Sequence, residues 1–460
     1  MDNFEGKNIL ILGFGREGQS TYQFLKKHIK NLNIAIADKK ECEKWDSRAR
    51  HLIKKDNPTV ICGEEYLKNL EKYEVIFKTP GIPGTIKEIK EAVSKGVEII
   101  TQTKLFLSLC RGGVVGVTGT KGKSTTASLI YHILNESGVS AVLLGNIGKP
   151  PLDYLEEGDE NTWFVFEMSS HQLVDIDKSP HISIFLNIFK EHLDYYDSFE
   201  DYFYAKENIT RFQTKKDHFI YNGDVPELNQ AAKKTQADKH AFSYKDKGAE
   251  CYFEKGNLFL RTGKDVEKII TADALPLIGK HNINNVLASI ITANIVGISS
   301  ERIAKALKTF TPLKTRLETI GKHNGITFVS DTLATIPEAT IAALEAYKGT
   351  VSTLICGGFD RGQDFKLLAK KIIELGVDNL ILFPVTGKKI KKEMQSMSDN
   401  NINYYSTDSM EEAVKFAYKH TKEGKVCLLS AASPSFSVFK DYQEEAELFK
   451  KFVENDMVVK

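Results

Sequence analysis

The 460-residue sequence predicts an α/β protein with three domains. Length is the first reason, because one hydrophobic core rarely serves more than about 250–300 residues. The second is that a buried strand runs into a glycine-rich loop and then a helix twice, near the start of the chain and near residue 118. The third is a regular alternation of strands and helices after residue 312. We place the domains at residues 1–101, 102–311 and 312–460, the outer two with doubly wound sheets.

The charge balance excludes several classes of function. The chain carries 62 basic and 61 acidic residues, a formal net charge of +1, without a long run of one sign. A nucleic-acid-binding face is therefore not expected. The first residues lack the basic and apolar regions of a signal peptide, and no apolar stretch approaches the roughly 18 residues that span a bilayer. We expect a soluble, cytoplasmic monomer without a membrane segment or a nucleic-acid partner.

The cysteines form no recognisable metal site. They are scattered, with no C-x-x-C pair and no adjacent histidines of the kind that bind zinc. We therefore expect reduced, buried thiols at all six positions, which are Cys42, Cys62, Cys110, Cys251, Cys356 and Cys427.

The first domain begins with a nucleotide-binding pattern. An apolar strand over residues 7–12 runs directly into G-x-G-x-x-G from Gly13 to Gly18, which opens a helix. A second strand over residues 33–37 ends at Asp38, twenty residues past Gly18. Glycines allow the backbone to approach a diphosphate, and an acid at this distance can bind a ribose or a base. We expect a Rossmann-like domain that binds NAD or a UDP-sugar, with a purely structural turn as the alternative.

A second loop of this domain belongs to the same sheet edge. Residues 75–78 form a short apolar strand that leads into the Pro/Gly segment from Thr79 to Gly84. Ligands bind at the carboxyl ends of strands in open α/β sheets. Thr79, Pro80 and Gly81 are therefore expected beside the nucleotide.

The central domain opens on a phosphate loop. A β-branched run over residues 114–118 gives way to glycines at every third position, then Lys123 and Ser124, and then a helical pattern. Lys123 can reach the terminal phosphates of ATP and Ser124 can ligate Mg²⁺. The strict pattern requires glycine at Val117, whereas the glycine is Gly116, so this loop is a variant. An accidental strand-to-helix turn does not explain why three glycines, a lysine and a hydroxyl coincide.

Further polar residues follow the next strands of this domain. Glu167 ends a buried strand and is well placed to hold Mg²⁺, while His192 follows another strand and would by itself be a surface residue. Lys206 lies one turn from Tyr202 on a helix, where a solvated lysine is the simpler interpretation. Residues 212–265 alternate as in a small antiparallel sheet flanking the domain.

The remaining polar segments mark a helix start and the third sheet. Asn282 and Asn285 lie one turn apart at the start of a long apolar helix, where they can bind a nucleotide or only cap the helix. In the last third, polar loops follow three strands, at residues 330–332, 357–362 and 430–436. These loops are expected at the ligand-binding edge of a Rossmann-like sheet.

Taken in order, these segments resemble the Mur ligases, ATP-dependent amino-acid ligases of peptidoglycan synthesis. The resemblance spans nearly the whole chain, and it depends on the order of the motifs more than on any one of them. The motifs that carry it are Thr118–Thr125, Gly145–Gly148, Glu167–Leu173, Glu191–Asp194, His281–Asn285 and Gly357–Gly362. It implies that the first domain binds UDP, the second ATP and the third glutamate.

The resemblance also implies a role for individual residues. The UDP-substrate would contact Gly13, Phe14, Gly15, Arg16, Glu17, Gly18, Asp38, Lys39, Thr79, Pro80, Gly81, Asn146, Ser169 and Gln172. ATP would contact Gly119, Thr120, Lys121, Gly122, Lys123, Ser124, Thr125, Asn282, Asn285, Arg316 and Asp331. Glutamate would contact Thr335, Arg361, Ser435, Phe436 and Tyr442. Lys123, Glu167, His192 and Lys206 would be catalytic, and two Mg²⁺ ions would be held by Ser124, Glu167, His192 and Lys206 as its carbamate.

The implied reaction joins glutamate to UDP-N-acetylmuramoyl-L-alanine through an acyl phosphate formed with ATP. The family typically has a lysine where this chain has Leu333, so a pocket for L-glutamate in place of D-glutamate is an alternative. A folylpolyglutamate synthase-like ligase would not explain the first domain, and an NAD-dependent oxidoreductase would explain only that domain. A non-catalytic nucleotide-binding protein is disfavoured because Lys123, Glu167, His192 and Lys206 are all present.

Overall fold

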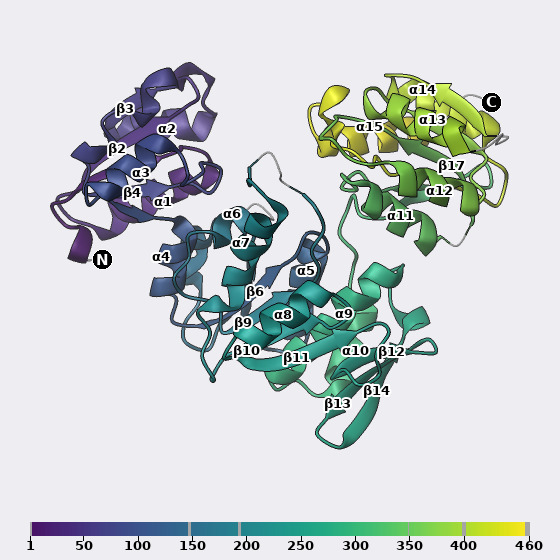
Figure 1. Ribbon diagram of the computed structural model, residues 1–460, viewed down its shortest axis with the longest axis horizontal. Coiled ribbons are helices and arrows are strands. Elements are labelled where there is room, and N and C mark those ends of the chain that lie inside the picture. Colours follow the sequence, from purple (N-terminus) through teal and green to yellow (C-terminus); the bar gives the residue numbers. More distant parts are fainter. Residues whose placement is uncertain (1, 146–148, 192–194, 348, 398–401, 456–460) are drawn as a thin grey trace. The chain divides into compact units, whose positions relative to one another are not determined.

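The computed structural model describes residues 2–145, 149–191, 195–347, 349–397 and 402–455, and it contains three β-sheets flanked by helices (Figure 1). The chain divides into two compact units, Met1–Ala272 with Asn284–Lys308, and Asp273–Ile283 with Thr309–Lys460. The first unit holds the N-terminal and central sheets, and the second holds the C-terminal sheet. The predicted α/β class with three sheets is confirmed, while the three domain boundaries stay predictions.

The N-terminal sheet is entirely parallel, with strand order β3-β2-β1-β4-β5. Its central strands are continuous apolar runs because helices cover both faces. The predicted strands are confirmed, whereas β3 and β5 were not expected because both are short and partly exposed. The elements are β1 Asn8–Leu12, α1 Arg16–His28, β2 Asn33–Asp38, α2 Ser47–Asp56, β3 Thr59–Cys62, β4 Val75–Lys78, α3 Lys87–Ser94 and β5 Glu98–Ile100.

The central sheet has nine strands in the order β14-β13-β12-β11-β10-β9-β6-β8-β7. Neighbouring strands are parallel from β7 to β12, and the last three are antiparallel. The predicted antiparallel sheet is confirmed for β12 to β14, which continue the edge of the main sheet, but it was wrong for β10 and β11, which lie in the same predicted segment and are parallel. The strands are β6 Gly113–Thr118, β7 Ala141–Gly145, β8 Trp163–Glu167, β9 Ile182–Phe185, β10 His218–Asn222, β11 Asp238–Ser243, β12 Cys251–Glu254, β13 Asn257–Thr262 and β14 Asp265–Thr271.

Helices cover both faces of this sheet and connect it to the N-terminal sheet. The phenylalanine ring of Phe106 lies 5.5 Å from that of Phe164 and 5.6 Å from that of Phe166, so one buried cluster extends across both sheets of the first unit. The helices are α4 Gln102–Leu109, α5 Lys123–Glu136, α6 Ser170–Leu173, α7 Phe199–Arg211, α8 Pro226–Lys234, α9 Lys280–Ile295 and α10 Ser300–Thr309.

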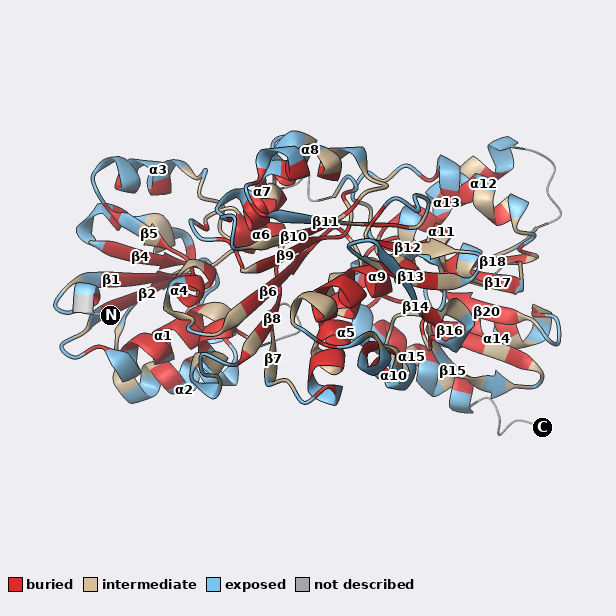
Figure 2. Ribbon diagram, turned by 90° about the horizontal axis from the view of Figure 1, so that it is seen from below, coloured by how far each residue is buried: buried red, intermediate tan, exposed pale blue. Residues whose placement is uncertain are grey.

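The C-terminal sheet has the order β15-β16-β20-β17-β18-β19, with only the β15–β16 pair antiparallel. Buried residues concentrate in its strands and on the helix faces turned toward them (Figure 2). The elements are β15 Glu318–His323, β16 Ile326–Ser330, α11 Pro337–Ala346, β17 Val351–Cys356, α12 Lys366–Glu374, β18 Asn379–Leu382, α13 Thr386–Met397, β19 Asn403–Ser406, α14 Met410–His420, β20 Val426–Leu429 and α15 Tyr442–Asn455. Among the described residues, no helix is both long enough and apolar enough to cross a membrane.

Candidate active site

One cavity of the first unit, with a volume of about 460 Å³, brings together residues from the N-terminal and central sheets. The glycine loop after β1 and the loop after β4 line it beside the start of α5 and the loop between β8 and α6. Its lining residues are Gly15, Arg16, Glu17, Thr79, Pro80, Gly81, Lys123, Gly145, Pro150, Pro151, Ser169, Ser170, His171, Gln172, Tyr195, Tyr202 and Lys206. Residues predicted for a diphosphate-linked substrate and for ATP thus share one cavity.

The phosphate loop is closed around its own lysine. The Lys123 ammonium donates hydrogen bonds to the carbonyl oxygens of Gly119, at 2.8 Å, and Thr120, at 3.0 Å. The Asn187 side chain accepts a hydrogen bond from the Lys121 N–H and donates one to the Lys121 carbonyl oxygen, each at 2.9 Å. Gly122 precedes α5 with φ of 90°, a conformation that favours glycine. A helix N-terminus and a lysine therefore meet at a loop suited to phosphate.

Lys206 is buried beneath this loop, which contradicts the simpler interpretation of a solvated lysine. Its side chain reaches the carbonyl oxygen of Gly119, at 3.1 Å, and the hydroxyl of Thr118, at 3.4 Å. Burial, and after it the positive charge of Lys123, hold the pKa of Lys206 well below its ordinary value. The lowered pKa favours the neutral amine, and a neutral amine is a nucleophile.

Glu167 supplies the chemistry expected of a cation ligand. Its carboxylate, at the end of β8, is 3% exposed, and no described residue donates a hydrogen bond to its Oε2 atom. A buried carboxylate oxygen without a partner is costly unless a cation compensates it. Mg²⁺ prefers such oxygen ligands, so the residues present fit this ion. Ser124 is the second residue of α5, while the predicted ligand His192 lies outside the described residues.

The two sheets of the first unit are joined by hydrogen bonds at the cavity. The Gln172 amide donates to Glu17 Oε1 at 2.8 Å, and Gln172 also forms a capping box with Ser169 at the start of α6. Burial raises the pKa of Glu17 to about 6. Asn146, predicted for the same substrate region as Ser169 and Gln172, lies outside the described residues.

Lys78 does not line the cavity but supports one of its loops, and the sequence reasoning missed it. Its ammonium is fully buried, 2.9 Å from Asp175 Oδ2 and 2.8 Å from the carbonyl oxygen of Ile82. It fixes the loop that begins at Thr79 and ties it to the central domain. The available signal was a charged residue that ends an otherwise apolar strand just before a Pro/Gly loop.

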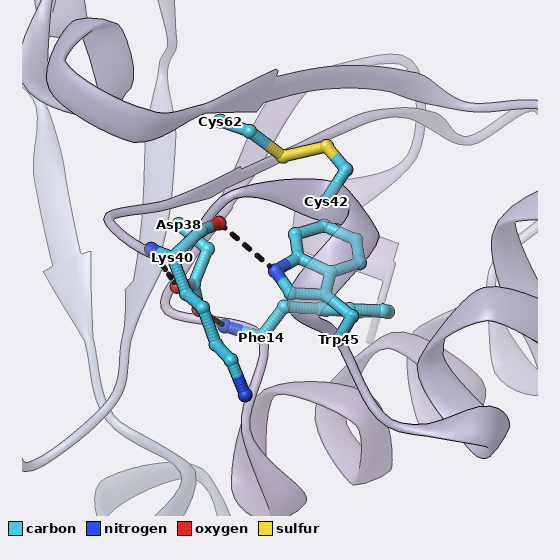
Figure 3. Close-up of a disulfide and its surroundings, with 6 residues drawn as sticks. All are labelled: Phe14, Asp38, Lys40, Cys42, Trp45 and Cys62. Atoms are coloured by element: carbon cyan, nitrogen blue, oxygen red, sulfur yellow. Dashed lines mark hydrogen bonds between the residues drawn. A yellow bond between two sulfur atoms is a disulfide. The ribbon is translucent and has the colours of Figure 1, made fainter.

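Asp38 holds the glycine loop after β1 in place through hydrogen bonds (Figure 3). Its carboxylate accepts hydrogen bonds from the backbone N–H groups of Phe14 and Lys40, and the Trp45 indole donates to the carbonyl oxygen of Lys40 at 3.1 Å. The Phe14 and Trp45 rings lie 5.0 Å apart. The Asp38 carboxylate thus joins the loops that follow β1 and β2. Contact between Asp38 and a nucleotide stays a prediction. Lys39 is exposed beside it.

A disulfide between Cys42 and Cys62 lies beside this loop, with its two Cα atoms 5.8 Å apart (Figure 3). The prediction that all six cysteines are reduced, buried thiols was therefore wrong for this pair. Cys62 ends β3 and Cys42 follows the neighbouring strand β2, so the fold brings the two together. Of the other four, Cys110 is half-buried and three are buried.

The predicted glutamate residues lie in the second unit, along one edge of its sheet. The loops after β16, β20 and β17 are neighbours because these strands are adjacent and parallel. The Ser430 hydroxyl donates to Asp331 at 3.1 Å, and the Phe359 N–H donates to the carbonyl oxygen of Pro434 at 2.7 Å. Of the predicted residues, Ser435 is buried, Thr335 is half-buried, and Arg361, Phe436 and Tyr442 are exposed.

The predicted ATP contacts are divided between the units. Asn285 belongs to the first unit, and its side chain packs against Gly122 of the phosphate loop. A Cβ atom added at Gly122 would lie only 2.5 Å from Asn285 Oδ1. Asn282 belongs to the second unit and donates to the carbonyl oxygen of Ile278 at 2.7 Å. Arg316 also belongs to the second unit, just before β15.

Comparison with protein families gives a match in each third of the chain. Residues 7–101 match the Mur ligase MurD-like N-terminal domain, residues 117–293 the Mur ligase middle domain, and residues 315–433 the Mur ligase glutamate ligase domain.

Two full-length relatives carry the same name. The UDP-N-acetylmuramoylalanine--D-glutamate ligase of Geobacillus sp. (strain WCH70) is 33% identical over 449 residues, covering 97% of each chain. The protein of that name from Acetivibrio thermocellus is 34% identical over 458 residues, covering 98% of this chain and 96% of its own.

Solved structures share the fold at lower identity. The UDP-N-acetylmuramate-alanine ligase MurC of Thermotoga maritima matches with a TM-score of 0.60 and 20% identity, over 99% of this chain and 100% of its own. MurF ligase of Thermotoga maritima, solved in complex with ADP, matches with a TM-score of 0.60 and 17% identity, over 99% and 97%.

Proposed function

This chain belongs to the Mur ligase family, and we propose that it is an ATP-dependent ligase that joins D-glutamate to UDP-N-acetylmuramoyl-L-alanine. The observation that carries the proposal is the shared cavity, where the glycine loop of the first sheet faces Lys123 and Lys206. A UDP-linked substrate held by that loop would present its far end to the phosphate loop. We place the reaction in the cytoplasmic synthesis of peptidoglycan precursors, and the monomeric state stays a prediction.

The first step activates the alanyl carboxylate, which is inert toward an amine. A carboxylate oxygen attacks the γ-phosphorus of ATP, the bond from that phosphorus to the bridging oxygen of ADP breaks, and an acyl phosphate forms. Lys123 and the N-terminus of α5 bind the phosphate oxygens on which charge develops. Ser169 and Gln172, held together by the capping box, orient the substrate at the cavity wall.

The second step forms the amide bond. The neutral amine of glutamate attacks the carbonyl carbon, and the tetrahedral intermediate expels inorganic phosphate as its C–O bond breaks. We assign glutamate to the edge of the C-terminal sheet that carries Asp331, Arg361 and Ser435. The proton of the attacking amine leaves to solvent or to a phosphate oxygen.

Magnesium would be held by Ser124, Glu167 and a carbamylated Lys206, with His192 as a further predicted ligand. Bound Mg²⁺ neutralises phosphate charge. The neutral amine of Lys206 can attack carbon dioxide, forming an N–C bond and releasing one proton. The product is an anion, so the modification converts a buried amine into an oxygen ligand.

Phosphate release from ATP tests the proposed function. We expect turnover only when UDP-N-acetylmuramoyl-L-alanine and D-glutamate are both present. Omitting either substrate gives the background, and L-glutamate in place of the D isomer tests the alternative raised by Leu333. Preference for L-glutamate would refute the assignment of the isomer. Turnover with a folate substrate, or no turnover with either isomer, would refute the ligase proposed here.

A further inference from the structure

A second cluster of metal-binding side chains lies at the other edge of the central sheet. The phosphate loop follows the carboxyl end of β6, whereas His218 is the first residue of β10 and Asp238 is the first residue of β11. These strands all run parallel, so the two groups lie at opposite ends of the strands. The cluster is therefore separate from the candidate active site.

The register of the sheet places three side chains on one face. His218 pairs directly with Asp238 across the parallel strands, and His240 is two residues beyond Asp238. Residues at i and i+2 of a strand share a face of the sheet. One ligand atom from each of His218, Asp238 and His240 can be chosen so that all three lie within 4.8 Å of one another.

The distances agree with those between the ligands of one ion. His218 Nδ1 lies 3.0 Å from His240 Nε2, and Asp238 Oδ2 lies 3.5 Å from the same nitrogen. Tetrahedral zinc with ligand bonds of about 2.0–2.1 Å separates its ligand atoms by about 3.3 Å. Small rotations of these side chains would suffice to centre an ion between them.

Glu250 orients one of the imidazoles. Its Oε2 atom lies 2.7 Å from His240 Nδ1, on the side of the ring away from His218 and Asp238. A carboxylate that accepts a hydrogen bond from Nδ1–H leaves Nε2 with its lone pair free to bind a metal, and zinc-bound histidines commonly have such a partner.

A third histidine is close but engaged elsewhere. His181 Nδ1 lies 2.8 Å from Asp217 Oδ1, and its ring centroid is 5.6 Å from that of His218. A hydrogen bond between the imidazoles of His218 and His240 would also explain their 3.0 Å distance. It would leave unexplained why Asp238 and Glu250 flank His240 from two sides.

We propose that His218, Asp238 and His240 bind one divalent cation of the zinc class, with Glu250 as the residue that positions His240. A solvent molecule would complete four-coordination, because Asp238 is exposed. The ion would cross-link β10 and β11, and through Glu250 it would fix the entry to β12, where the parallel part of the sheet meets its antiparallel edge. Its role would be to stabilise this part of the first unit.

Calorimetric titration of the chelator-treated full chain with zinc chloride tests this proposal. Millimolar Mg²⁺ is present throughout, so that it competes for the oxygen ligands near Glu167. We expect one zinc per chain and a rise in the thermal unfolding midpoint on binding. His218→Ala and His240→Ala should each weaken binding at least about tenfold, and Glu250→Gln should weaken it about tenfold while retaining all three ligands.

His51→Ala is the matched control, because His51 is an exposed histidine on α2. It should leave zinc affinity unchanged. Cobalt substitution adds a readout of geometry, since a four-coordinate site gives an intense visible band that the His240→Ala variant should lose. If an alanine variant does not fold, Glu250→Gln and His218→Asn replace it. Zinc affinity and stoichiometry that do not change in the cluster variants, or the absence of binding to the unaltered chain, would overturn the proposal.

Discussion

Replacing Glu445 by glutamine should stabilise the second unit at neutral pH. Glu445 lies on α15 with 0% exposure, and no described residue donates a hydrogen bond to either of its carboxylate oxygens. Burial raises the pKa of this carboxyl from 4.5 to about 8. The folded protein therefore keeps a proton that the unfolded chain has already released at pH 7.

The size of the effect follows from that difference in pKa. Below pH 4.5 both states hold the proton and the folded state has no penalty, while the stability is lost progressively as the pH rises toward 8. From pH 4.5 to pH 7, roughly two and a half pH units, the unfolded chain gains about 1.4 kcal/mol per unit by releasing the proton. The folded state is therefore destabilised by about 3 kcal/mol at pH 7. Glu445→Gln removes this penalty because the amide does not ionise, and its own buried polar atoms resemble those of the protonated acid.

Urea unfolding of the wild type and the variant between pH 4.5 and 8 measures the difference directly. The gain of Glu445→Gln in the free energy of unfolding should be near zero at pH 4.5 and should grow to about 3 kcal/mol at pH 7. Glu447→Gln, at an exposed position of the same helix, should show no such trend. A gain that does not depend on pH, or a loss of stability at pH 7, would refute the burial argument.

Three further predictions concern the first unit. Lys123→Ala should abolish ATP turnover with nearly unchanged calorimetric affinity for the UDP-substrate; a collapse of that affinity would contradict the separate assignment of the two nucleotides. Lys206→Ala should lose most of its phosphate release, and high acetate should restore part of it by replacing the carbamate; wild-type rates without acetate would rule the carbamate out. Reducing the Cys42–Cys62 disulfide should weaken UDP-substrate affinity several-fold by loosening the loop beside Asp38, while Cys110→Ser should not; equal affinity in both redox states would contradict this.

Hydrophobic periodicity predicted the elements that are buried on both faces. Strand β4 begins and ends where the sequence placed it, because it is an apolar run closed by a polar residue. The edge strands β3 and β5 were missed because short, half-exposed strands carry little such pattern. Strands β10 and β11 were expected to be antiparallel, and the helix α8 between them explains why they are parallel.

The candidate site divides in the same way. Lys123 and Glu167 could be predicted because each follows a strand directly, so that sequence position fixes their place at the sheet edge. The burial of Lys206 could not, since a lysine on an amphipathic helix is usually solvated and only the packing of α7 against β6 places it under the phosphate loop. Lys78 was missed although its strand and its loop were both predicted, because its partner Asp175 lies in the next domain.

The disulfide and the proposed zinc site share one reason for escaping prediction. Cys42 and Cys62 are 20 residues apart, and His218 pairs across the sheet with Asp238 at the same separation, about one strand-helix-strand repeat. Two residues one repeat apart meet only if the strands have the right register, and a shift of one residue would turn a side chain to the other face. Register is set by packing between elements and not by the local pattern. Cysteine and histidine pairs about one repeat apart in a parallel α/β chain are therefore candidates for contact that a sequence can nominate, and only the fold decides which of them meet.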